Sequence, residues 1–156
     1  MKFLPLLFSL LLVSPAAAEM ADPSSAVTLR GKCQSLTAGA EDLGNICASE
    51  IMQVIYTDHH MELVVWTDDP SGRFIVFSGE MEQGPDAKSF QHVDLVIAAP
   101  DGSGDRNVTY KAKGLCTFGD YRAGNAQYRC EAVTKDGSVY NFAFLTDAGA
   151  PENMLD

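Results

Sequence analysis

The chain has 156 residues, 46% of them hydrophobic, and carries 11 lysines and arginines against 21 aspartates and glutamates. A chain of this length builds one domain of ordinary size with its own hydrophobic core. Its formal net charge of −10 disfavours binding to nucleic acid or to anionic lipid and favours a basic protein or another cationic partner.

Residues 1–18 are predicted to be a cleavable bacterial signal peptide. Lys2 is the only charged residue in this stretch, residues 3–13 are mostly apolar, and three alanines at 16–18 supply the small residues that a cut before Glu19 requires. No cysteine stands at the cut, so we do not expect a lipoprotein, and no later run is long and apolar enough to span a membrane. We expect a periplasmic or secreted protein.

Four cysteines follow the predicted cut, and an even number in an exported protein indicates disulfides. Thirteen residues separate Cys33 from Cys47, and thirteen separate Cys116 from Cys130. We therefore predict two local bridges, Cys33–Cys47 and Cys116–Cys130. A zinc site is the rival interpretation, but the chain has no Cys-x-x-Cys pair.

The chain order reads as a flexible leader (19–25), a single β domain (26–147) and a flexible tail (148–156). Apolar and polar residues alternate along 27–34, 107–118 and 126–133, which is typical of strands with one buried face. In all three segments the cysteines share the parity of the predicted core face. The bridges are therefore expected to be structural.

Three further segments, 61–66, 74–77 and 93–98, are apolar on both faces and rich in valine, isoleucine and aromatic residues. Glycine, proline and aspartate mark the turns between segments, as at Asp136-Gly137. About eight strands joined by short turns predict an all-β fold, either an antiparallel sandwich or a small barrel. A helical stripe within 40–55 leaves a short helix there as an alternative.

The last third of the chain carries one resemblance. Its motifs are Gly-Leu-Cys-Thr at 114–117, Cys-Glu-Ala-Val-Thr at 130–134 and Phe-Leu-Thr-Asp at 144–147. This stretch of about 35 residues resembles the end of small secreted bacterial proteins of unknown function, in which a Gly-x-Cys-Thr strand and a Cys-x-Ala-x-Thr strand form the closing hairpin. The resemblance implies a structural unit and no activity.

No catalytic motif is apparent, and we expect neither a cofactor nor a bound metal. Both cysteine pairs are assigned to bridges, and the chain has no Gly-x-Ser-x-Gly nucleophile motif. Asp58, His60, Glu62 and His92 would form a metal site only if two strands that the sequence cannot place came together. The 1-3-5 calcium spacing at 101–105 lacks the glycine and glutamate that such a loop also needs.

The candidate binding residues are Trp66, the only tryptophan, and the predicted turn Asp58, His59 and His60. A lone aromatic on a sheet can anchor a partner, although core packing is its more ordinary role.

Two functions from different classes fit these observations. The first is an exported, non-enzymatic binding or accessory protein of the bacterial envelope, such as an inhibitor, a subunit or an adhesin-like domain. The second is a small β-barrel that binds or turns over a small apolar or cationic ligand. The second requires one large apolar cavity, whereas a sandwich should be filled by residues such as Phe74, Val76, Leu95, Tyr110 and Phe142.

Overall fold

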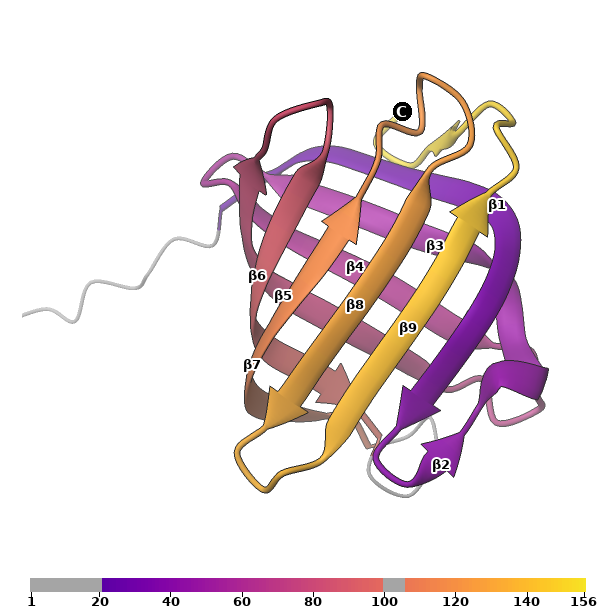
Figure 1. Ribbon diagram of the computed structural model, residues 1–156, viewed down its shortest axis with the longest axis vertical. Helices are drawn as coiled ribbons and strands as arrows, with labels where there is room; N and C mark the ends of the chain where they lie inside the picture. Colours follow the sequence, from indigo (N-terminus) through magenta and orange to yellow (C-terminus); the bar gives the residue numbers. More distant parts are fainter. Residues whose placement is uncertain (1–20, 100–105) are drawn as a thin grey trace, which may run out of the picture.

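The computed structural model describes residues 21–99 and 106–156, which form a closed antiparallel barrel of eight strands (Figure 1). The predicted signal peptide and the tested calcium spacing lie outside these residues. The strands in chain order are β1 (Pro23–Ala38), β2 (Glu41–Asp42), β3 (Cys47–Tyr56), β4 (His60–Thr67), β5 (Phe74–Gln83), β6 (Ser89–Ala98), β7 (Val108–Phe118), β8 (Gln127–Thr134), β9 (Val139–Thr146) and β10 (Glu152–Asn153). In the described part of the chain, no helix is long and apolar enough to cross a membrane.

The barrel is closed by β1, which is long enough to pair with two different strands. Residues 23–30 of β1 pair with β3, and residues 31–38 pair with β9. The strand changes partner at Gly31, where an added Cβ would lie 2.1 Å from the carbonyl oxygen of Leu145. A bulge between Cys33 and Ser35 then shifts the register. Only glycine permits this close approach, and bulges produce the bend that closure needs.

The remaining strands follow one another as neighbours, from β3 to β9, so the topology is up-and-down. We call upper the end with the β3–β4 and β5–β6 turns and the β7–β8 loop, and lower the end with the β4–β5 and β8–β9 turns. The prediction of an all-β fold is confirmed, and the barrel is chosen over the sandwich.

The segment 40–55 contains no α-helix. It forms β2, a single 3₁₀ turn η1 (Gly44–Ile46) and most of β3. The apparent helical stripe at Leu43, Cys47, Ile51 and Ile55 has a spacing of four, which is also a multiple of the strand period of two. Val54 alone distinguishes the two periods. It lies on the outer face of β3, whereas Ile51 and Gln53 lie on the inner face.

The described part of the predicted leader, residues 21–25, and the predicted tail both contact the barrel. Ser24 donates a hydrogen bond to the Ile55 carbonyl, and the strand β1 begins at Pro23. Near the C-terminus, β10 pairs with β1 at Val27 and Thr28. The first half of β1 extends past the end of β9, and β10 occupies that otherwise free edge.

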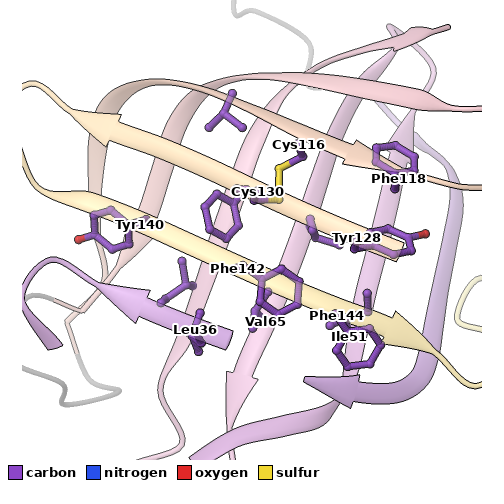
Figure 2. Packing of buried hydrophobic residues seen from close by; sticks show 14 of the residues in the cluster. Leu36, Ile51, Val65, Cys116, Phe118, Tyr128, Cys130, Tyr140, Phe142 and Phe144 are labelled. Atoms are coloured by element: carbon purple, nitrogen blue, oxygen red, sulfur yellow. A yellow bond between two sulfur atoms is a disulfide. The ribbon is translucent and has the colours of Figure 1, made fainter. Parts of the chain in front are cut away.

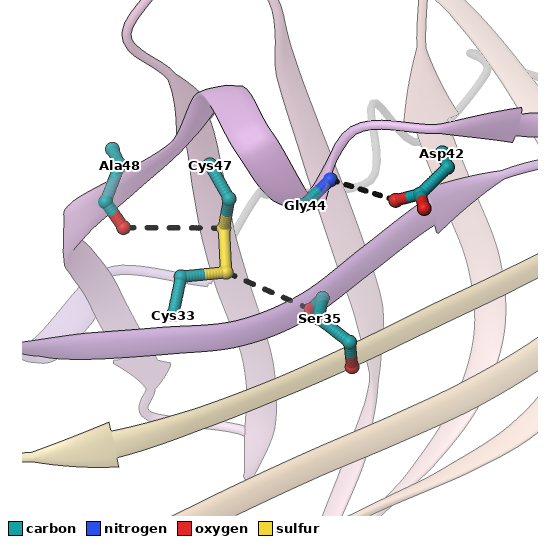
Figure 3. The surroundings of a disulfide bond; sticks show 6 residues. All are labelled: Cys33, Ser35, Asp42, Gly44, Cys47 and Ala48. Atoms are coloured by element: carbon teal, nitrogen blue, oxygen red, sulfur yellow. Dashed lines mark hydrogen bonds between the residues drawn. A yellow bond between two sulfur atoms is a disulfide. The ribbon is translucent and has the colours of Figure 1, made fainter.

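Both predicted disulfides are present. Cys116 and Cys130 face each other directly on β7 and β8, inside the barrel, with a Cα–Cα distance of 4.0 Å. Cys33 and Cys47 join β1 to the start of β3, beside η1, with a Cα–Cα distance of 6.0 Å (Figure 3). The parity argument is confirmed: Cys116–Cys130 is buried, and Cys33 lies opposite the buried Phe144. Cys33 and Cys47 are only half-buried, but both pack against the core.

Candidate functional site

The interior of the barrel is filled with side chains (Figure 2). The largest of the fully buried residues are Tyr128, Phe77, Phe142, Phe144, Leu36, Ile51, Met61 and Leu63. Aromatic rings run across the middle, with ring centroids 6.5 Å apart for Phe77 and Phe142 and 6.0 Å apart for Phe142 and Phe144. Among the described residues there is thus no large apolar cavity of the kind that a barrel for an apolar ligand requires.

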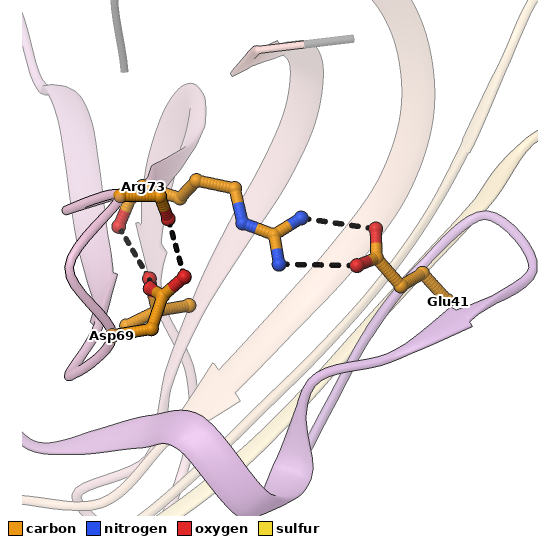
Figure 4. A network of polar contacts seen from close by, with 5 residues as sticks. Glu41, Asp69 and Arg73 are labelled. Carbon is orange, nitrogen blue, oxygen red and sulfur yellow. Dashed lines mark hydrogen bonds and ion pairs between the residues drawn. The ribbon is translucent and has the colours of Figure 1, made fainter. Parts of the chain in front are cut away.

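The lower end of the barrel is closed by a paired arginine (Figure 4). Arg73, at the start of β5, donates two hydrogen bonds to the Glu41 carboxylate, at 2.9 and 3.0 Å. Asp69 nearby accepts hydrogen bonds from Ser71 and Thr67, which lower the pKa of its carboxyl group. The hydrogen bond to Glu41 raises the pKa of Arg73, so the guanidinium stays charged. Beside this pair a pocket of about 60 Å³ remains, which is room for about two water molecules.

The outer face of the barrel, in contrast, carries a row of uncharged side chains. Six residues lie directly opposite one another on consecutive strands β1, β3, β4, β5, β6 and β7, namely Thr28, Met52, Val64, Val76, Ile97 and Thr109. We call these six residues the outer row. Thr28, Val64 and Val76 are buried, at 8%, 8% and 6% exposure, whereas Met52 and Ile97 are half-buried and Thr109 is exposed. The solvent side of an antiparallel sheet is usually polar, so an uncharged row with four apolar members marks a candidate contact surface.

Trp66 lies at the lower edge of the outer row, and it is not a core residue. It points outward from β4, opposite Phe74 on β5, and both side chains are half-buried. A surface hollow of about 410 Å³ borders Trp66, with Glu50 and Asp68 among its other lining residues. The hollow therefore joins an aromatic face to two carboxylates, a combination that suits a cationic group.

Acidic residues also flank the outer row toward the upper end. Glu62 and Glu80 lie on the outer faces of β4 and β5, and Glu82 and Asp94 are exposed on β5 and β6. Leu95 lies between them and the outer row. The face as a whole is an apolar strip with acidic margins.

The predicted turn residues lie at the upper end of the same strand. His59 has a left-handed backbone with φ of 67°, and the carboxylate of Asp58 accepts a hydrogen bond from the His60 amide at 3.0 Å. The His60 ring lies 2.7 Å from the Ser78 hydroxyl on β5, measured from Nε2 to Oγ. The contact with Ser78 was not foreseeable from the sequence, since it depends on the β4–β5 register.

Tyr56 and Glu62 complete this cluster. The Tyr56 hydroxyl donates a hydrogen bond to the Glu62 carboxylate at 2.9 Å. Burial of the phenol, followed by this hydrogen bond and the charge of Glu62, raises the pKa of Tyr56 to about 12. The hydroxyl therefore stays neutral at physiological pH and stabilises the end of the β3–β4 hairpin.

The four residues considered for a metal do not form one centre. His60 and Glu62 lie on β4, whereas His92 lies on β6, beyond the intervening strand β5, and contacts Glu82 at 2.9 Å. Across residues 21–99 and 106–156, no three histidine, cysteine or carboxylate groups are placed to hold a metal ion.

The predicted binding residues therefore fall into two places on one outer face. Trp66 and His60 are both on β4, six residues apart, which corresponds to about 20 Å along a strand. The sequence identified this strand but missed the partners that the neighbouring strands supply: Met52, Phe74, Val76, Leu95 and Ile97. The sequence did contain a sign of most of these partners, because several segments were recognised as apolar on both faces. Their outward residues, however, were expected to fill a core or line a pocket.

Phe74, Val76 and Leu95 were expected to fill the interior if the fold were a sandwich; in the barrel they lie on the outer face, although Val76 is buried there at 6% exposure. Each has the outward parity of its strand, while the adjacent Ile75, Phe77 and Val96 are buried inside. Phe142 is inside, as expected, and Tyr110 is half-buried. Alternation decides which half of a two-sided apolar strand enters the barrel, and the sequence alone does not fix that choice.

Comparisons with known proteins give no relative. No family model matches the chain, and neither the curated proteins nor the solved structures include a match. The resemblance of the C-terminal stretch to small secreted proteins stays a prediction.

Proposed function

We propose that this chain is an exported, non-enzymatic binding protein of the bacterial envelope, which holds a basic protein partner against the outer face of β3–β6. The observation that carries the proposal is the placement of the only tryptophan. Trp66 lies outside the barrel, beside Glu50 and Asp68, although the interior accommodates many other aromatic residues. Trp66 thus keeps part of its indole available to a partner, and tryptophan is enriched among interface anchors.

The surface around Trp66 has the composition of a protein-binding site. Interfaces combine apolar or aromatic anchors at the centre with a polar rim. Here the anchors are the half-buried Trp66 and Phe74 with Met52 and Ile97 of the outer row, and the rim is acidic. A lysine or arginine of the partner would stack on the Trp66 indole between the two carboxylates, with apolar side chains covering the outer row.

One internal contact competes with this role. Arg30 lies 3.6 Å from the Glu50 carboxylate, and both side chains are largely exposed, at 71% and 45%. Exposed pairs of this kind contribute little stability, so exchange of Arg30 for a partner's cation costs little.

The two disulfides indicate an oxidising compartment outside the cytoplasm. The predicted signal peptide supports export to the periplasm or the medium. The partner is therefore sought among envelope proteins with basic surfaces.

The test is affinity capture from a native envelope extract with three baits: the wild-type protein, Trp66→Ala and Leu115→Ala. Leu115 is the matched control, because it is an apolar outward residue, 42% exposed, on β7. We expect Trp66→Ala to weaken the captured complex at least about tenfold, as expected for an interface anchor, and Leu115→Ala to retain it. Because Trp66 is the only tryptophan, its fluorescence also reports the contact directly.

Salt dependence provides the second measurement on the captured complex. Association steered by acidic margins slows as salt rises, while dissociation changes little. Equal retention of the partner by Trp66→Ala, together with unchanged Trp66 emission when the wild-type protein binds, would refute the proposed surface. An association rate that does not change with salt would refute the electrostatic part.

A further inference from the structure

The upper end of the barrel contains a pocket that the proposed function does not use. Its volume is about 220 Å³, and it lies between β3, β5, the start of β6 and the β7–β8 loop. At about 30 Å³ per water molecule, this volume corresponds to about seven waters. The pocket is thus too small for a drug-sized ligand but large enough for one functional group of a small molecule.

The wall of this pocket carries polar groups from inward-facing positions. Gln53 on β3 is 4% exposed, and its carbonyl oxygen accepts a hydrogen bond from the Tyr128 hydroxyl at 2.8 Å. Gln83 on β5 donates from its amide nitrogen to the Ser89 hydroxyl oxygen at 3.2 Å. A buried amide is costly unless its polar atoms have partners, so Gln53 and Ser89 are not the residues that packing alone would select here.

Each of these three side chains keeps unused hydrogen-bond donors or acceptors. Gln53 has used its carbonyl oxygen and keeps its N–H donors. Ser89 has accepted one bond and keeps its O–H donor. Gln83 has used one N–H and keeps the other N–H and its carbonyl acceptor. These three residues therefore offer donors at Gln53, Ser89 and Gln83 and a free amide acceptor at Gln83, which together suit a group with one C=O and one N–H, such as a secondary amide.

The remaining lining suits a neutral, partly apolar ligand. Ile55, Met81 and Phe118 form an apolar wall, and Phe118 stacks on Tyr128 with ring centroids 5.2 Å apart. Asp120 and Arg122 contribute opposite charges from the loop, so the lining has no net charge from these two residues. These two charges give no net attraction for a ligand of either sign, whereas the methyl group of an acetamide would pack on the apolar wall.

The loops that border the pocket are held in defined conformations. Tyr121 is 8% exposed, and the Arg122 guanidinium lies over its ring at 4.7 Å. Across the pocket, Asp86 and Ala87 adopt left-handed φ values of 59° and 55°. Such conformations are costly for residues with a Cβ, so the β5–β6 turn is shaped at some expense beside the pocket.

We propose that the upper pocket binds a small neutral molecule through a secondary amide, of the kind that an N-acetyl group presents. The carbonyl of that amide accepts from Gln53 and Ser89, its N–H donates to Gln83, and its methyl group contacts Met81 and Phe118. This site is separate from the outer face and goes beyond the proposed function.

The experiment compares N-acetylglucosamine with glucose, which has a hydroxyl group in place of the acetamide. Each is titrated into the ¹⁵N-labelled full chain, and chemical-shift changes are mapped by NMR. We expect N-acetylglucosamine to shift the signals of the pocket residues, including the Gln53 and Gln83 side-chain amides, with an affinity in the millimolar range. Glucose should leave them unchanged.

Two variants identify the atoms involved. Gln83→Leu removes the acceptor at an exposed position and should weaken binding about fivefold, the effect of one hydrogen bond. Gln34→Leu, at an exposed position outside the pocket, is the control and should bind normally. Gln53→Leu also removes the partner of Tyr128, so it is interpreted only if its spectrum remains folded.

Three outcomes would overturn the assignment: equal shifts with glucose, no shifts with N-acetylglucosamine at millimolar concentrations, or unchanged affinity in Gln83→Leu. None of them bears on the partner captured through Trp66, so the two proposals fail independently.

Discussion

The two disulfides close loops of identical length in very different surroundings. Each joins cysteines 14 positions apart. Cys116–Cys130 links facing positions of one hairpin inside the barrel, where the two residues are 0% and 5% exposed. Cys33–Cys47 spans a corner with β2 and η1 between its ends, and both cysteines are half-buried.

This contrast separates two contributions that are usually confounded. A disulfide restricts the unfolded chain by an amount that depends on loop length, about 3 kcal/mol for a loop of roughly 15 residues. That contribution is the same for both bridges here. Any difference between them in stability or reactivity therefore comes from the folded environment.

The largest expected effect is the loss of the internal bridge. Replacing both residues by alanine, Cys116→Ala with Cys130→Ala, should lower the free energy of unfolding by about 5 kcal/mol, because it removes the loop constraint and also two buried sulfur atoms. Urea denaturation of the oxidised wild-type protein and the double variant measures the difference.

The corner bridge provides the matched comparison. Cys33→Ala with Cys47→Ala removes an equal loop constraint but little buried volume, so we expect about 3 kcal/mol. Equal losses for the two double variants would show that the buried sulfur atoms contribute nothing beyond the loop constraint.

A smaller effect is the order in which the bridges are reduced in the native protein. Thiol–disulfide exchange needs access to a sulfur atom, which the corner offers and the barrel interior does not. We expect a mild reductant to open Cys33–Cys47 first and Cys116–Cys130 only on unfolding. Alkylation followed by peptide mass spectrometry gives the order, and simultaneous release of all four thiols would contradict it.

The same comparison shows what the sequence does and does not determine. Equal spacing and the parity of the cysteines were sufficient to pair them correctly. They did not reveal that Cys33–Cys47 lies at a corner, because that corner depends on the change of partner strand at Gly31. Of the two predicted local bridges, only Cys116–Cys130 links the two strands of one hairpin.

The two-residue period of a strand made the strands predictable, but it did not show which face of each strand points into the barrel. A period of two and turn residues identify strands in any β fold. Where both faces are apolar, as in β4 and β5, either the odd-numbered or the even-numbered residues could face the core. Only the neighbouring strands decide that Leu63 and Phe77 enter the core while Val64 and Val76 form the outer row.

The binding residues show a similar limit. Trp66 and the turn before β4 stood out by composition, and both lie on the outer face. The upper pocket did not stand out, because Gln53, Gln83 and Ser89 come from three strands and have no shared motif. These three residues come together only because the barrel closes. The sequence did not distinguish a barrel from a sandwich.

The smallest expected effect is the dependence of stability on pH. It should differ between the end of β8, the strand that carries Cys130, and the end of β3, the strand that carries Cys47. At the end of β8, Asp136 accepts a hydrogen bond from the Thr134 hydroxyl, which, with the Ser138 amide, lowers the pKa of the Asp136 carboxyl. At the end of β3, Tyr56 has its pKa raised from 10.0 to about 12, chiefly by burial. The β8–β9 turn and the β3–β4 hairpin should therefore weaken at opposite extremes of pH.

The signs follow from proton linkage. The pKa of Asp136 is 3.8 in the unfolded chain and lower in the folded one, so the unfolded chain takes up the proton first as the pH falls. The stabilising effect of Asp136 is therefore present above pH 3.8 and is lost as the pH falls below it. Tyr56 loses its proton near pH 10 when unfolded and near pH 12 when folded, so its contribution is complete below pH 10 and is lost between about 10 and 12. Urea midpoints of wild type, Asp136→Asn and Tyr56→Phe across pH measure both. We expect the Asp136→Asn difference from wild type to shrink only in acid, and the Tyr56→Phe variant to lose less stability than wild type above pH 10. If both variants tracked the wild-type pH profile in parallel, neither group would be the source of the pH dependence, and the contrast between the two regions would be confined to their disulfides.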